Sequence, residues 1–242
     1  MENWLSIAVA VYLIGMILYG HYKGFIKLAV SLAAVIAALV IVNISMPAVT
    51  KFVKENTSFE AMVSQSMKEA MGLETGGEGE LGQAETQGTP SDQRAIIESL
   101  NLPQSIKEDL LENNNNEIYQ ILGVDQFADY IGSYLSDLIV RTVGFVILFI
   151  VVYVVIRVIM GWLDLIARLP VLSGMNKVAG AVLGGVQGLI FLWIFCLVVT
   201  AFSGTSWGLD LMTQIEASPW LLFLYNNNFL NVIIAGVLQE LL

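Results

Sequence analysis

Residues 178–202 read VAGAVLGGVQGLIFLWIFCLVVTAF, 25 residues without a single Asp, Glu, Lys or Arg. A helix rises about 1.5 Å per residue and the hydrocarbon core of a bilayer is about 30 Å thick, so about 20 apolar residues cross it. This stretch therefore predicts a membrane-spanning helix, and it decides the fold class.

Three other segments have the same apolar character and predict three more spans. They are residues 4–22, 25–46 and 138–160. The basic residues inside them, Lys27, Arg141 and Arg157, lie near span ends, where a long side chain can extend to the lipid headgroups. The sequence thus predicts an all-α polytopic membrane protein, with four transmembrane helices in two hairpins and additional amphipathic extracytoplasmic helices.

Composition agrees with this prediction and shows where the charge is concentrated. Of the 242 residues, 56% are hydrophobic and 13% charged, and the mean hydropathy is +0.72; soluble domains contain about 25% charged residues. Residues 47–137 contain 16 acidic and five basic side chains, whereas the other 151 residues contain five acidic and six basic ones. No basic face is available for nucleic acid.

The spans divide the chain into four parts. Residues 1–46 form the first transmembrane hairpin, 47–137 an acidic extracytoplasmic segment, 138–203 the second transmembrane hairpin, and 204–242 an extracytoplasmic apolar tail. Apolar residues at helical spacing in the acidic segment predict an amphipathic helix over about 50–71 and short helices broken at Pro103. Between them, residues 72–92 hold six glycines and five acids, a composition that predicts disorder.

Two further apolar stretches flank the second hairpin. The first is the stripe Phe127, Tyr130, Ile131, Tyr134 and Leu135, which we expect either to pack on the span ends or to lie in the membrane interface. The second is the tail, where Ser218 and Pro219 have the pattern of a helix start. Its apolar runs are short and predict interfacial or re-entrant helices, with a fifth span over 220–242 as the alternative.

Basic residues in short connections predict the orientation, because they stay in the cytoplasm. The two short connections and their flanks contain Lys23, Lys27, Arg157, Arg168 and Lys177. Both connections should therefore be cytoplasmic, which places both termini and the acidic segment outside. Lys51 and Lys54, beyond the second span, argue mildly against this orientation.

Residues that could carry catalysis are scarce. The chain has one histidine, His21, and one cysteine, Cys196, in different spans or turns. Such a pair supports neither a His-dependent triad nor a Cys/His metal site, and no EF-hand, P-loop or nucleophile-elbow pattern occurs. The sequence predicts a protein that is not an enzyme and that needs no cofactor or metal.

A stripe of glycines in the fourth span predicts close helix packing. Gly180, Gly184 and Gly188 recur every fourth residue, a spacing that lets helix backbones approach in lipid. A matching small face in the second span consists of Ala29, Ala33 and Ala37. We expect these two faces to pack together within one chain; contact with a second copy or with another protein is the alternative.

Two segments together resemble a known family. Residues 19–25 read YGHYKGF, and residues 169–184 read LPVLSGMNKVAGAVLG, followed by Gly188. They resemble the CvpA family, the colicin V production proteins of bacterial inner membranes. The resemblance singles out the turn residues Gly20, Lys23, Gly24, Phe25, Asn176 and Lys177, besides the glycines of the stripe. Its glycines would serve tight turns and close helix approach, and its lysines would meet anionic headgroups.

The resemblance implies a bacterial inner-membrane protein that supports toxin production or export and envelope homeostasis. This chain departs from the family in its long acidic segment, and it has Tyr22-Lys23 where the family often has paired arginines. We expect a non-enzymatic accessory or scaffold, whose partner in the bilayer is another membrane protein or a second copy. The alternative is an oligomeric small channel or exporter, with Gln187 and Asn43, the deepest polar groups of their spans, lining its path.

Overall fold

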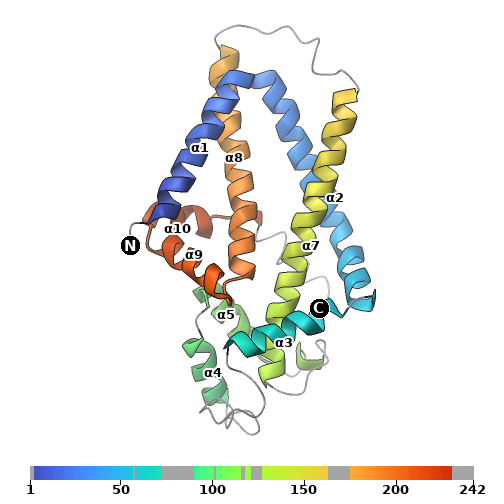
Figure 1. The fold of residues 1–242 in the computed structure, drawn as a ribbon, viewed down its shortest axis with the longest axis vertical. Coiled ribbons are helices and arrows are strands. Elements are labelled where there is room, and N and C mark those ends of the chain that lie inside the picture. The colour runs from blue at the N-terminus through green and yellow to red at the C-terminus, as the bar shows by residue number, and fades with distance from the viewer. Residues whose placement is uncertain are drawn as a thin grey trace. The chain divides into compact units, whose positions relative to one another are not determined.

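The computed structural model describes residues 3–56, 58–71, 90–100, 102–115, 118–120, 127–162 and 175–230. Every element with determined bounds is an α-helix (Figure 1), which confirms the predicted all-α class. These helices are α1 (Trp4–Lys23), α2 (Phe25–Asn56), α3 (Phe59–Met71), α4 (Pro90–Ser99), α5 (Gln104–Glu112), α7 (Phe127–Trp162), α8 (Met175–Ala201), α9 (Ser206–Glu216) and α10 (Pro219–Asn226).

Four of these helices are long and apolar enough to cross a membrane, so the four predicted spans are confirmed. They are α1, α2, α7 and α8. The second span does not end at Met46 as predicted, because α2 continues through Pro47 to Asn56. The amphipathic helix predicted over about 50–71 is therefore two pieces, the end of α2 and the separate helix α3. The break falls where Asn56 and Ser58, whose side chains compete for backbone hydrogen bonds, stand close together.

The chain forms two compact units, each assembled from distant parts of the sequence. Unit 1 comprises Met1–Val49, Val143–Leu197 and Gln214–Leu242, and unit 2 comprises Thr50–Thr142 and Val198–Thr213. Helices α2, α7 and α8 each contribute to both units. Unit 1 contains five basic and four acidic residues, and unit 2 contains six basic and 17 acidic ones. The charge of the protein is therefore a property of unit 2.

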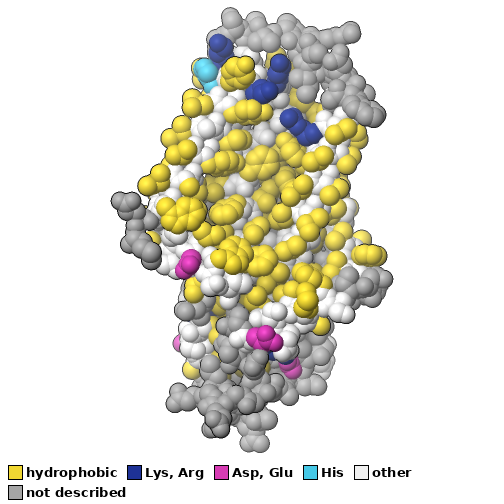
Figure 2. Space-filling view, in the orientation of Figure 1, with side chains coloured by type: hydrophobic (Ala, Val, Ile, Leu, Met, Phe, Trp, Pro, Cys, Tyr) yellow, Lys and Arg dark blue, Asp and Glu magenta, His cyan; other side chains and the backbone are white. Residues whose placement is uncertain are grey.

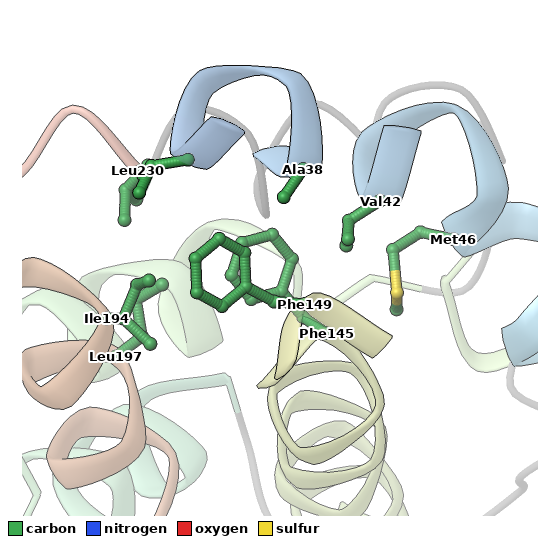
Figure 3. Close-up of a cluster of buried hydrophobic side chains, with 9 residues drawn as sticks. Ala38, Val42, Met46, Phe145, Phe149, Ile194, Leu197 and Leu230 are labelled. Atoms are coloured by element: carbon green, nitrogen blue, oxygen red, sulfur yellow. The ribbon is translucent and has the colours of Figure 1, made fainter. Parts of the chain in front are cut away.

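The core of unit 1 joins α2, α7 and α8. Phe145 and Phe149 of α7 lie between the side chains of α2 and those of α8 (Figure 3). The buried partners are Val35, Ala38, Val42 and Met46 from α2, Ile194 and Leu197 from α8, and Leu230 from the tail. Phe149 also makes an edge contact with Phe191 of α8, with ring centroids 6.3 Å apart.

Unit 2 has a core of its own, built from the acidic segment and the first turns of α7. The predicted break at Pro103 is confirmed, because α4 ends at Ser99 and α5 begins at Gln104. The apolar stripe that starts α7 is buried rather than interfacial. Its Tyr130 is fully buried and donates a 2.8 Å hydrogen bond to the carbonyl oxygen of Leu110 in α5.

Some sequence predictions fall on residues outside the described parts. Most of the strip predicted to be disordered, residues 72–89, lies outside them, and Pro90 to Asp92 form the start of α4. In the tail, Ser218 and Pro219 begin α10 as predicted. This helix has eight residues, about 12 Å of length, and is too short to cross a membrane. Residues 231–242, which the alternative fifth span would need, are also outside the described residues.

Candidate functional site

Helices α1 and α8 touch backbone to backbone along a line of glycines. A Cβ atom built on Gly20 would collide with the carbonyl oxygen of Gly180, and one built on Gly180 would collide with that of Gly20. A Cβ on Gly184 would strike the carbonyl oxygen of Met16, and one on Gly188 would lie 2.9 Å from the Met16 Cβ. We call this contact the glycine seam: Gly20, Gly24, Gly180, Gly184 and Gly188.

The partner of the glycine stripe was predicted wrongly. We expected α8 to pack its glycines on the alanine face of the second span, but Ala33 is exposed and Ala29 and Ala37 are only partly buried. The buried side of α2 faces the core of unit 1 instead. The physical reason lies in α1, where Gly20 and the following Gly24 leave the backbone uncovered. Glycine against glycine permits a closer approach than glycine against alanine.

One end of the seam includes the turn between α1 and α2. Gly24 has a φ of +78°, a left-handed conformation that favours glycine, and a side chain there would collide with the Asn176 amide. The Asn176 Oδ1 accepts a hydrogen bond from the backbone N–H of Ile26, with a nitrogen–oxygen distance of 3.4 Å. Asn176 on α8 thus provides an acceptor for one of the first N–H groups of α2, which have no partner within the helix. Gly24 and Asn176, from separate motifs in the sequence, are therefore in contact.

The other end of α1 is tied to the tail. Trp220 donates a 2.8 Å hydrogen bond from Nε1 to the Ser6 hydroxyl, whose oxygen lies 3.3 Å from the Ser218 hydroxyl. The amide of Asn3 donates to the carbonyl oxygen of Gln214, at 2.6 Å. Figure 1 shows α1 beside α8, with α10 next to the start of α1. Both ends of α1 are therefore fixed to distant parts of the chain.

The deepest polar groups of the spans are not brought together. Gln187 of α8 is only 4% exposed, and its Nε2 donates a 3.3 Å hydrogen bond to Ser31 of α2. Its Oε1 accepts no hydrogen bond from any residue that the structure describes. Asn43, in contrast, is exposed on α2. Gln187 is thus part of a helix contact within the chain, and Asn43 is on an outer face.

A buried ion pair escaped the sequence prediction. Arg141 was expected to extend to the headgroups, but its side chain is 6% exposed and is ion-paired with Asp137, one turn earlier on α7. Within the described part of the chain, the Arg141 Nη1 donates no hydrogen bond. The i,i+4 spacing of an acid and a base at the head of an apolar helix was the available signal. We missed it because we assigned Asp137 to the acidic segment and Arg141 to the span.

Polar groups of the acidic segment surround this part of unit 2. Partial burial raises the pKa of Asp109, the charge of nearby Glu112 raises it further, and a hydrogen bond from Tyr134 lowers it. Tyr119 stacks on Tyr130 with ring centroids 5.0 Å apart, and burial raises its pKa to about 12. Across the described residues, no three His, Cys, Asp or Glu side chains are grouped so that they could hold a metal ion.

The remaining motif residues occupy simpler environments. Cys196 is buried and lines a small apolar pocket with Leu5, Val9 and Leu192. Lys23, Phe25 and Lys177 are exposed at the end of α1 and the starts of α2 and α8. Of the turn residues singled out by the resemblance, only Gly20, Gly24 and Asn176 take part in the seam or its end contact.

Comparison with known protein families gives a match to part of the chain. Residues 119–227 match the family model described as Colicin V production protein. This part of the chain contains α7 to α10, and thus Asn176, Lys177 and the glycines of α8, whereas the motif at residues 19–25 precedes it. No curated protein and no solved structure matches the chain. Residues 119–227 of this chain, which has four helices long and apolar enough to cross a membrane, are thus similar to the colicin V production proteins.

Proposed function

We propose that the protein is a non-enzymatic accessory or scaffold in a bacterial inner membrane, and that it supports the production or secretion of a peptide toxin and envelope homeostasis. The family match over residues 119–227 carries this proposal. On the same proposal the basic connections between the spans face the cytoplasm, and both termini and the acidic segment, residues 47–137, are extracytoplasmic.

The structure indicates a different partner-binding surface from the glycine stripe considered in the sequence analysis. The glycines of α8 are already used against α1, so they offer no free surface. The outward faces of the spans instead expose apolar side chains, including Val182 and Val186 on α8 and Val154 and Val158 on α7. A scaffold in the bilayer would hold its partner against one of these faces.

The cellular test is toxin secretion. The gene would be deleted in the bacterium that encodes it, a plasmid encoding colicin V and its export genes would be introduced, and the growth-inhibition zone on a sensitive lawn would be measured. We expect a smaller zone, restored by the full chain supplied from a second plasmid. An unchanged zone in the deletion strain would contradict the proposed role.

The molecular test is in-cell photocrosslinking from single sites on four outward faces. Val11, Ile44, Val158 and Val186 are exposed on α1, α2, α7 and α8, respectively. A scaffold predicts a reproducible crosslink to one different membrane protein from one face and none from the opposite face. Crosslinks that form only a ladder of multimers of this chain would contradict it and favour a self-assembled channel.

An oligomeric small channel or exporter is the second candidate, and exposed Asn43 favours it. A polar side chain on the outer face of a span is costly in lipid, and a second copy or an aqueous path would relieve that cost. A cysteine at Asn43 or Gln187 should then react with a membrane-impermeant maleimide, and the parent chain with its buried Cys196 is the control. Full protection of both positions in a functional protein would contradict the channel.

A further inference from the structure

The basic side chains of unit 1 gather at one end of its long helices. Helices α1 and α7 finish at this end, and α2 and α8 start there, so residues far apart in sequence meet. Figure 2 shows Lys and Arg side chains gathered where α1 ends and α2 begins, with hydrophobic side chains below them. We call this surface the basic end: Lys23, Lys27, Arg157 and Lys177. All four side chains are exposed.

The described residues 3–49, 143–162 and 175–197, to which the basic end belongs, contain no acidic side chain. None of its four cations forms an ion pair with any residue that the structure describes. In unit 2, by contrast, Lys68 lies 2.7 Å from Asp129, Arg94 lies 3.0 Å from Glu98, and Arg141 is paired with Asp137. Three bases of unit 2 are thus ion-paired, whereas the bases of the basic end have no acidic partner among the described residues.

Aromatic rings hold two of these cations against their helices. The Lys23 amine lies 5.6 Å from the centre of the Tyr19 ring, and the Arg157 guanidinium lies 6.0 Å from the centre of the Tyr153 ring. Such contacts orient a cation without neutralising it, so its N–H groups stay available. The N-termini of α2 and α8 add partial positive charge at the same end.

The surface next to these cations is apolar and exposed. Val154 and Val158 lie within one turn of Arg157 on α7, and Val178 and Val182 follow Lys177 on α8. Cations at the rim of an apolar face match a molecule with an anionic head and hydrocarbon chains. A soluble phosphate compound would use only the cations, and a zwitterionic lipid carries no net charge for them.

From this geometry we propose that the basic end binds the headgroup of an anionic phospholipid, with the acyl chains on the valine faces of α7 and α8. Lys27 on α2 and Arg157 on α7 are the two cations chosen for the test. Both are exposed, neither has an acidic partner among the described residues, and they come from different helices of one unit. This binding is independent of the proposed role in toxin secretion.

Native mass spectrometry of the full chain from nanodiscs tests the proposal. The discs would contain phosphatidylcholine with a minor fraction of phosphatidylglycerol, and the phosphatidylglycerol retained by the protein would be measured against concentration. Each juxtamembrane cation contributes about 1 kcal/mol, or about fivefold in affinity. The double variant Lys27→Gln/Arg157→Gln should therefore bind phosphatidylglycerol about 25-fold more weakly, while phosphatidylcholine retention is unchanged.

A charge-matched control uses two bases of unit 2 that both contact Glu98. Arg94→Gln/Lys107→Gln removes the same charge from side chains that already contact Glu98, and it should leave lipid retention unchanged. An equal loss in this control, or full retention in the first variant, would overturn the proposal, as would displacement of the lipid by glycerol 3-phosphate. Lys27→Arg/Arg157→Lys keeps both charges and must retain the lipid, which separates charge from folding.

Discussion

The interiors of the two units are packed in different ways. In unit 1 the tightest contact is the glycine seam, where side chains are absent and backbones meet. In unit 2 the interior is filled by large side chains such as Tyr130, Ile131 and Leu135. Lipid is as apolar as leucine, so burying apolar side chains against each other in a membrane gains little, and close backbone packing has to replace it. In water the same burial is the main stabilising force.

Charge follows the same division. Three bases of unit 2, Lys68, Arg94 and Arg141, form ion pairs with acids of the same unit, whereas the four bases of the basic end have no acidic partner among the described residues. Among the described residues, ion pairing within the chain is thus a feature of unit 2, whereas the bases of the basic end depend on their surroundings for a counter-charge. Each prediction below tests one side of this contrast.

The largest effect is expected at the ion pair of α7. Arg141→Met leaves the carboxylate of Asp137 without its arginine at a site that is 7% exposed. Breaking a buried pair on one side costs about 3–5 kcal/mol, whereas replacing both partners by apolar residues is often nearly neutral. We therefore expect strong destabilisation in Arg141→Met and recovery in Asp137→Leu/Arg141→Met, measured by chemical unfolding in detergent. An additive loss in the double variant would contradict a closed ion pair.

The second effect is expected at the glycine seam. A side chain at Gly184 meets the backbone of α1 rather than a flexible side chain, so the helices must separate. Overpacking costs about 1–3 kcal/mol, and Gly184→Leu should lie at the upper end of that range, measured as a lower melting temperature in detergent. Gly15→Leu is the matched control, because a Cβ at Gly15 meets nothing within 4 Å. Equal destabilisation by both substitutions would contradict a specific seam.

Sequence reasoning succeeded where a local property decides the structure. Hydropathy identified the four spans, and Pro103 and the Ser218-Pro219 pair marked helix boundaries that the structure contains. These features depend on the length of an apolar run or on the missing N–H of proline, which neighbours in space do not alter.

The partners of those elements could not be predicted in the same way. The spacing of Gly180, Gly184 and Gly188 predicts a close contact but does not say which helix supplies it. Gly20 would have been the clue, but its position at the end of α1 suggested a turn. The environment of Arg141 was predicted wrongly because a position near a span end suggests access to the headgroups. Its burial instead depends on unit 2, which includes the start of α7.

A smaller effect of opposite sign is expected at Gln187. Its hydrogen bond to Ser31 contributes about 0.6 kcal/mol by the average for membrane helices. Its unpartnered Oε1, buried in the same contact, costs about 1–3 kcal/mol. Gln187→Leu removes both and should raise the melting temperature slightly, whereas Ser31→Ala removes only the favourable part and should lower it. A loss of stability in Gln187→Leu would indicate that a water or a second copy satisfies this oxygen.

The smallest effect is a pH dependence in unit 2. Because the pKa of Asp109 is raised in the folded protein, the folded state binds a proton more tightly than the unfolded chain. Its contribution to stability is therefore greatest in acid and is lost as the pH rises through the raised pKa. Asp109→Asn keeps an acceptor for the Tyr134 hydroxyl without the charge, so it should be slightly more stable than the parent at pH 7, by less than about 0.5 kcal/mol.

The difference in stability between Asp109→Asn and the parent should vanish below the ordinary pKa of 3.8. It should shrink in a Glu112→Gln background, because Glu112 is one of the charges that disfavour ionisation. Melting curves at both pH values measure it, and an advantage for Asn that persists in acid would mean that packing, not ionisation, distinguishes the two side chains.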